Sequence, residues 1–187
     1  MDVVLIGRAA VMFAVTNVDD LVLLAVFFGQ AAGHRGELKV VAGQFLGFAA
    51  ILAASVAGAL GAGLLPDGAV RWLGVLPVLL GIRAAWQAWR QDDDEPAPVS
   101  GVLTVAAVCF ANGGDNIGVY VPAFAATGPA GLVGYGVVFL VGVTAWCVIG
   151  RFLATRPAVA RALARWGDVV LPVVLIALGV LILAGAF

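Results

Sequence analysis

Long apolar runs alternate with short polar stretches over most of the chain. Six of these runs reach about the 20 apolar residues that a helix needs to cross the hydrocarbon core of a bilayer. Helices are the open-chain structure that satisfies every backbone polar group in lipid. The pattern therefore predicts six helical spans, at about residues 3–29, 39–64, 69–90, 101–127, 130–154 and 166–187.

The composition agrees with a lipid environment. Of the 187 residues, 63% are hydrophobic and only 11% are charged, whereas a soluble domain is typically about 25% charged. A soluble core of this size could not cover so much apolar surface, so we expect an all-α integral membrane protein. The net charge is −1 and there is no basic tail, so we expect no nucleic-acid partner.

The two halves of the chain resemble each other. Phe13-Ala14 precedes an aspartate pair, and Phe110-Ala111 precedes Asp115-Asn116. An Arg-Trp pair followed by Leu-Pro-Val also occurs in both halves, and all these offsets are 94 to 97 positions. Because each half holds three spans, the second half enters the membrane from the opposite face. We expect two inverted three-helix repeats, 1–90 and 101–187, joined by an acidic cytoplasmic linker at 91–100, with a substrate site between the repeats near the midplane.

Basic residues are distributed unequally between the two sides that six spans define. One side collects Arg35, Lys39, Arg83, Arg90, Arg151, Arg156, Arg161 and Arg165, and the other collects Arg8 and Arg71. Basic loop residues mark the cytoplasmic side of a membrane protein. We therefore expect a multi-pass protein of the cell (inner) membrane with both termini extracytoplasmic.

Two polar stretches lie near the middles of the first and fourth predicted spans. They are Thr16-Asn17-Val18-Asp19-Asp20 and Asn112-Gly113-Gly114-Asp115-Asn116. Ionisable residues at that depth are costly and mark functional sites. Glycine pairs and clusters of Asn and Asp are poor helix formers, so we expect local unwinding that frees backbone carbonyls. The alternative is that these side chains only join helices through hydrogen bonds.

The chemistry of the two stretches suits a cation. At helical spacing the polar residues of each stretch share one face, so two half-sites of similar chemistry should face each other. Carboxylate, carboxamide and carbonyl oxygens are the ligands that a divalent cation takes. Three carboxylates in a low-dielectric pocket cannot all stay ionised without a positive charge, so either a metal or a proton must bind. Competition between the two predicts exchange of a cation for protons.

Four stretches, in the same order along the chain, resemble the CadD-type cadmium resistance transporters of the LysE superfamily of exporters. They are TNVDDL at 16–21, GQFLGF at 43–48, LGVLPVLLGIR at 73–83 and NGGDNIGVY at 112–120. The similarity runs through nearly the whole chain, and its most specific part is the NGGDN block at 112–116. The resemblance implies a six-span membrane protein with an extracytoplasmic N-terminus, in agreement with the distribution of arginine.

The resemblance also implies a function, which is efflux of cadmium or a similar divalent cation from a bacterial cytoplasm. The cation would be the transported substrate, and we expect no permanently bound cofactor and no enzymatic activity. Carried onto this chain, the role of metal ligand falls on Asp19, Asp20, Asp115 and Asn116. Supporting roles fall on Asn17, Asn112, Thr16, Gln44 and Cys109.

Two of these assignments, and the role of the small residues at 58–63, have competing interpretations. Gln44 could reach the first half-site or could join two helices. Cadmium is a soft ion that favours sulfur, so Cys109 could be a ligand, or it could be a small buried apolar residue. The small residues at 58–63 permit close helix contacts within one chain or between chains, which leaves a homo-oligomer open.

Other function classes fit the sequence less well. An amino-acid or amine exporter of the same superfamily would use the acidic site for an ammonium group, but Arg83 is its one candidate partner for a substrate carboxylate. A thiol-relay oxidoreductase would need cysteines related by the repeat, whereas Cys109 and Cys147 both lie in the second half. An intramembrane hydrolase would need a nucleophile beside a base, and the spans contain no Ser–His or His–Glu pair.

Overall fold

The computed structural model consists of helices and short connections wherever it is described. The described residues are 3–62, 72–73, 75–90, 101–127, 129–156, 158–159, 172–173, 175–177 and 179–184. The predicted linker at 91–100 and half of the predicted sixth span lie outside them. The helices are α1 (Val3–Thr16), α2 (Val18–Gln30), α3 (Gly33–Ala62), α4 (Val75–Arg90), α5 (Val102–Asn112), α6 (Gly114–Ala125) and α7 (Pro129–Ala154).

Between two and four membrane spans can be assigned within the described residues. The helices Gly33–Ala62 and Gly131–Ala154 are each long and apolar enough to cross a bilayer. Helix α1 with α2, and α5 with α6, are each long enough as a pair, bent by 57° and 63° respectively. These four units coincide with the first, second, fourth and fifth predicted spans. The 16 residues of α4 fall within the third.

Both bends lie in the polar stretches, as the helix-breaking residues there predict. The first is at Asn17 and the second at Gly113. The backbone ladder continues through them, because the Asn17 amide donates to the Phe13 carbonyl (3.1 Å) and the Gly113 amide to the Cys109 carbonyl (3.0 Å). The chain therefore bends sharply without a long unwound segment.

Gly113 lets the second bend lie close to α3. A Cβ atom on Gly113 would overlap the outer part of the Ile51 side chain in α3, so a larger residue would require Ile51 to move. The absence of a side chain permits the bent pair α5–α6 to lie directly against the middle of α3.

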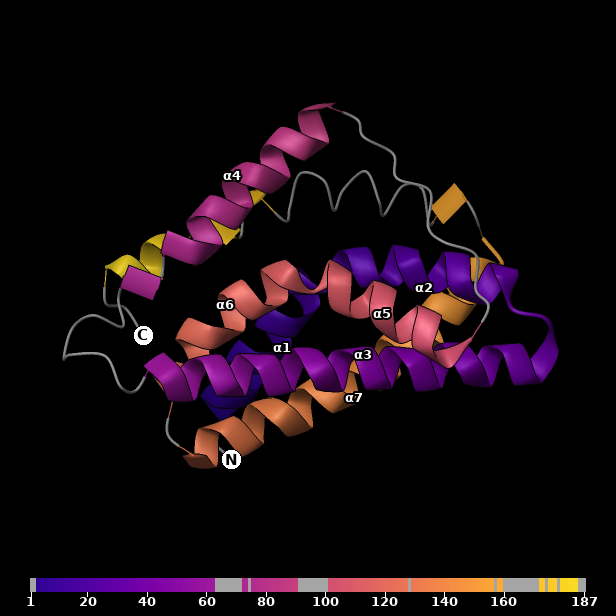
Figure 1. The fold of residues 1–187 in the computed structure, drawn as a ribbon, viewed down its shortest axis with the longest axis horizontal. Coiled ribbons are helices and arrows are strands. Elements are labelled where there is room, and N and C mark those ends of the chain that lie inside the picture. Colours follow the sequence, from indigo (N-terminus) through magenta and orange to yellow (C-terminus); the bar gives the residue numbers. More distant parts are fainter. Residues whose placement is uncertain are drawn as a thin grey trace.

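Each bent pair packs on the long helix of the other half of the chain. Helix α3 lies against α5 and α6, and α7 lies against α1 and α2 (Figure 1). Glycines on α3 make the first contact close, since an added Cβ on Gly43 or Gly47 would lie 2.7 Å from the backbone carbonyl oxygen of Val102 or Ala106. Small residues permit such close contact between membrane helices. The two halves are thus interleaved.

Among the described small residues at 58–62, Gly58 makes a close intramolecular contact. An added Cβ on Gly58 would lie 2.7 Å from the Val121 side chain of the same chain, whereas an added Cβ on Gly61 would meet nothing within 4 Å. Gly58 therefore serves packing between α3 and α6.

The start of α3 and the end of α7 lie at the same end of the bundle, opposite the N-terminus of α1 (Figure 1). The Arg151 guanidinium donates a 3.0 Å hydrogen bond from Nε to Glu37 Oε1 there. Arg35 and Lys39 are exposed on the same first turns of α3. This end therefore carries Arg35, Lys39 and Arg151, three of the eight basic residues that the sequence assigns to one side.

Aromatic side chains fill the interior between the polar stretches and the end of the bundle at which α1 begins. Tyr120 and Phe139 are fully buried with ring centroids 4.7 Å apart, and Tyr120 stacks on Phe124 at 5.8 Å. The rings come from α1, α3, α6 and α7. The cluster comprises Phe13, Phe48, Tyr120, Phe124, Tyr135 and Phe139.

Candidate functional site

The two polar stretches meet inside the bundle and share hydrogen bonds. Thr16 and Asn17 are fully buried at the end of α1. The two hydrogens of the Asn17 amino group are shared among three acceptors, which are the Phe13 carbonyl (2.8 Å), Thr16 Oγ1 (3.0 Å) and the Tyr120 hydroxyl (2.8 Å). The first stretch is thereby tied to α6, which carries Tyr120 one helical turn beyond Asn116.

Asn17 is also bound from two further directions. Its side-chain oxygen accepts a 3.1 Å hydrogen bond from the amino group of Asn116 in α6. Its backbone carbonyl accepts a hydrogen bond from the indole nitrogen of Trp146 in α7. Asn17 thus joins the bend of the first half to two helices of the second half. Its carbonyl, which the sequence suggested as an extra ligand, is already occupied by Trp146.

The aspartate pair is held by carboxamide donors. Asp20 is 2% exposed and accepts hydrogen bonds from Gln44 of α3 (2.9 Å) and from Asn112 of α5 (3.1 Å). Asn112 also donates to Asp19 (2.8 Å), whose other oxygen accepts from the Asp20 amide (3.0 Å). The Gln44 side chain reaches the first polar stretch, and the same hydrogen bond joins α3 to α2, so the contact agrees with both interpretations of Gln44.

Asp115 and Asn116 differ from the aspartate pair. Both carboxylate oxygens of Asp115 and the side-chain oxygen of Asn116 are buried and accept no hydrogen bond from the part of the chain that is described. The backbone amides of these two residues, in the first turn of α6, lie near the Asp115 carboxylate without reaching hydrogen-bond geometry. A buried acceptor without a donor costs about 1–3 kcal/mol, and more when it is charged. Three such atoms on consecutive residues are the least satisfied polar groups of the site.

The three carboxylates lie within electrostatic reach of one another, since Asp115 senses the charges of both Asp19 and Asp20. Among the described residues, however, no three His, Cys, Asp or Glu side chains are close enough to hold a metal ion together. A cation bound in this arrangement would need carboxamide oxygens as well as carboxylates.

Within the described part of the chain, the cysteines and Arg83 make no hydrogen bond to the carboxylates. Cys109 and Cys147 are both buried and free. The Cys109 thiol borders the network, because it is directed at the backbone carbonyl of Gln44, at 3.9 Å, where α5 contacts α3. Arg83 is exposed on α4.

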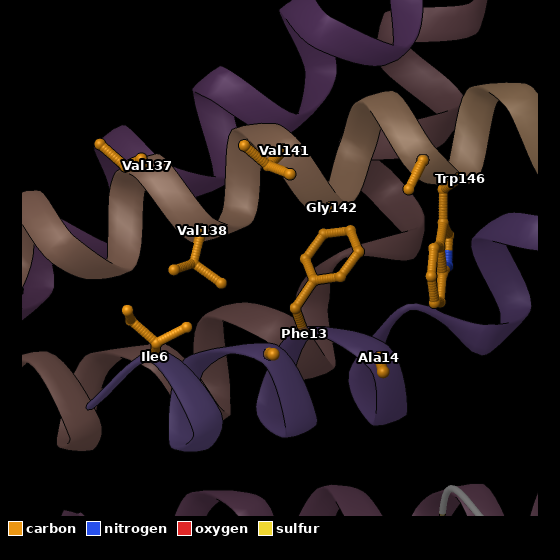
Figure 2. Close-up of a pocket in the computed structure, with 10 residues that line it drawn as sticks. Ile6, Phe13, Ala14, Val137, Val138, Val141, Gly142 and Trp146 are labelled. Carbon is orange, nitrogen blue, oxygen red and sulfur yellow. The ribbon is translucent and has the colours of Figure 1, made fainter. Parts of the chain in front are cut away.

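An apolar groove of about 570 Å³ lies beside the site, between α1 and α7. Figure 2 shows Phe13 and Trp146 side by side at one end of it, where the Trp146 ring reaches toward the end of α1. Since Trp146 also binds the Asn17 carbonyl, its ring separates the groove from the polar network. The lining residues are Ile6, Ala10, Phe13, Ala14, Val137, Val138, Val141, Gly142, Ala145 and Trp146.

Sequence reasoning assigned no site role to Tyr120 or Trp146. Tyr120 carried a usable signal, because it lies four residues after Asn116 and so on the same helix face. Trp146 carried none, since its contact with Asn17 spans 129 positions.

Comparison with known proteins gives one positive result. Residues 13–186 match the family described as "Cadmium resistance transporter". No curated protein and no solved structure gives a significant match.

Proposed function

This chain belongs to the cadmium resistance transporter family, and on that premise we propose that it exports a divalent cation, above all cadmium, through the polar network between its two halves. The observation that carries the proposal is the set of three unpartnered buried oxygens on Asp115 and Asn116, facing a site that already holds two more carboxylates. Oxygen atoms without donors are what a cation satisfies. The metal is the substrate of a transporter, and no enzymatic step is involved.

The ligand set that we propose is Asp19, Asp20, Asp115 and Asn116. Asn112 and Gln44 now donate to the aspartate pair, so these carboxamides act in place of a positive charge. To bind a cation, the carboxylates must exchange those N–H groups for metal contacts. The mostly oxygen site is a weak one for a soft ion, which suits an exporter because the ion must also leave.

Charge balance supports exchange with protons. Three acidic side chains that are largely removed from water require a compensating charge, and either one divalent cation or protons can supply it. The two therefore compete for the same oxygens. We propose that inward proton movement returns the site to its metal-free form after each release.

The arrangement of the helices supports alternating access by two inverted repeats. We propose residues 1–90 and 101–187 as the repeats and 91–100 as the cytoplasmic linker. Each bent pair packs on the long helix of the other repeat, so a rocking movement of one repeat against the other changes the surroundings of the site. Inverted-repeat transporters bind substrate at bent helices near the midplane.

We propose that the basic end of the bundle faces the cytoplasm, in accordance with the positive-inside rule. The support is the exposed Arg35 and Lys39 beside the Arg151–Glu37 contact. The aromatic cluster then closes the site on the extracytoplasmic side, while Asp19, Asn112 and Asp115 on the other side are only half-buried. This arrangement corresponds to a site closed to the exterior, with both chain termini on the extracytoplasmic side.

Transport by purified protein in liposomes tests the proposal. Asp115→Asn keeps the size of the side chain and removes its charge, so cadmium flux and cadmium-dependent proton flux should both be lost. Glu37→Gln removes one carboxylate at the bundle end and should keep both fluxes. Full cadmium flux in Asp115→Asn would contradict the proposed site, and proton flux with lysine in place of cadmium would assign the chain to the amine exporters.

A further inference from the structure

We propose that Tyr120 and Asn17 are positioning residues that orient the Asn116 carboxamide, so that its oxygen and not its amino group is offered to the cation. The inference deepens the proposed function and rests on it. It follows from the direction of a chain of hydrogen bonds that begins at Thr16 and ends at the unpartnered oxygen of Asn116.

The first step is the direction of the Thr16–Tyr120 hydrogen bond. The Thr16 hydroxyl has one hydrogen and donates it to the Met12 carbonyl, at 2.9 Å. The 2.9 Å contact between Thr16 Oγ1 and the Tyr120 hydroxyl must then have Tyr120 as its donor. With its only hydrogen used, the Tyr120 oxygen can act toward Asn17 only as an acceptor.

The second step fixes the Asn17 side chain. Its amino group faces three acceptors, which are the Phe13 carbonyl, Thr16 Oγ1 and the Tyr120 hydroxyl oxygen. If the carboxamide were turned over, its oxygen would face the Phe13 carbonyl oxygen, which has no hydrogen to donate, and two hydroxyls that could bind it only by giving up the hydrogen bonds they now donate to Met12 and Thr16. The Asn17 oxygen is therefore held toward α6.

The third step fixes the orientation of the Asn116 carboxamide. Because the Asn17 oxygen only accepts, Asn116 must present its amino group to it, at 3.1 Å. Asn116 is 1% exposed, and its side-chain oxygen is left buried and without a partner among the described residues, next in sequence to the two unpartnered oxygens of Asp115. A carboxamide has no orientation of its own, since its oxygen and nitrogen are nearly the same in shape. Tyr120 and Asn17 supply that orientation.

The consequence concerns affinity for the cation. With Asn116 turned over, an N–H group would point at the metal, and repulsion would replace a ligand bond. Replacing a residue that hydrogen-bonds to a metal ligand and orients it typically changes metal affinity by about 10- to 100-fold. We therefore expect Tyr120 to act on affinity more than on the maximum rate of transport.

The test is Tyr120→Phe, which keeps the ring in the aromatic cluster and removes the hydroxyl. Cadmium binding by the purified protein should weaken about tenfold, and KM for cadmium should rise by a similar factor while the maximum rate changes little. Tyr135→Phe is the matched control, because Tyr135 is a buried tyrosine of the same cluster with no contact to Asn17 or Thr16. It should leave cadmium binding unchanged.

Two further variants make the outcome decisive. Asn116→Asp offers oxygen in both orientations, so in the Tyr120→Phe background it should restore part of the lost affinity. Thr16→Val removes the acceptor for the Tyr120 proton and should also weaken cadmium binding, which provides the test if Tyr120→Phe does not fold.

Unchanged cadmium binding in folded Tyr120→Phe or Thr16→Val, or an equal loss in Tyr135→Phe, would overturn the positioning role. The proposed function would still stand if Asp115→Asn abolished transport, and would fail separately if it did not.

Discussion

The amino group of Asn112 in α5 donates a 2.8 Å hydrogen bond to the Asp19 carboxylate in α2, across 93 positions of sequence. The same group donates to Asp20 at 3.1 Å. One neutral side chain of the second half thus holds both carboxylates of the first half. The two polar stretches therefore form a single hydrogen-bond network assembled from separate helices.

Replacement of Asn112 by Ala should destabilise the protein. Two carboxylates lose a donor, and a largely buried acceptor left without one costs about 1–3 kcal/mol. The thermal midpoint of the purified protein in detergent should fall accordingly. Thr144→Val is the control, since the exposed Thr144 hydroxyl bonds only to the Leu140 carbonyl of its own helix, and surface changes of this kind stay within about 0.5 kcal/mol. Equal midpoints for the two variants would contradict the bridging role of Asn112.

Two glycines of α3 should respond in opposite ways to alanine. A methyl group on Gly47 would lie 2.7 Å from the Ala106 carbonyl oxygen and from Cys109 Cβ, and overpacking of this kind costs about 1–3 kcal/mol. A methyl group on Gly61 meets nothing within 4 Å, and alanine is the better helix former by about 1 kcal/mol. Thermal midpoints should therefore fall for Gly47→Ala and stay equal or rise for Gly61→Ala. A tolerated Gly47→Ala would show that α3 and α5 are farther apart than described.

Removal of both cysteines should leave transport largely intact. The Cys109 thiol is directed at the Gln44 carbonyl rather than at the carboxylates, and buried cysteine behaves as a small apolar residue. Cadmium flux of the Cys109→Ala, Cys147→Ala double variant should stay close to that of the unmodified protein. A large loss would revive the sulfur ligand or the thiol relay, and the single variants would then identify the cysteine responsible.

Cadmium should stabilise the folded protein through Asp115. A ligand that binds only the folded state adds about 2.7 kcal/mol at a concentration 100 times its dissociation constant. A cadmium titration should therefore raise the thermal midpoint of the unmodified protein, and Asp115→Asn should remove most of that rise. Magnesium at the same concentrations is the control for non-specific ion effects. An equal rise in Asp115→Asn would place cadmium elsewhere on the molecule.

Local chemistry made much of this molecule predictable from the sequence alone. The length and apolarity of the runs predict the spans, and the described helices α3 and Gly131–Ala154 agree with two of them. The bends at Asn17 and Gly113 lie inside the two polar stretches, because glycine and asparagine weaken a helix wherever they occur. The likeness to cadmium resistance transporters rested on these two stretches and on two more, at 43–48 and 73–83, and the family match confirms it. All of these properties belong to residues close together in the chain.

Contacts between distant residues were decided only by the tertiary structure. The bent pairs pack on the opposite long helices because glycines such as Gly43 and Gly47 admit a neighbouring backbone, and the sequence does not say which one. The partners of Asn17, Tyr120 in α6 and Trp146 in α7, are 103 and 129 positions away. Which oxygens remain unpartnered depends on the direction of every hydrogen bond around them, and that direction exists only once the helices have come together.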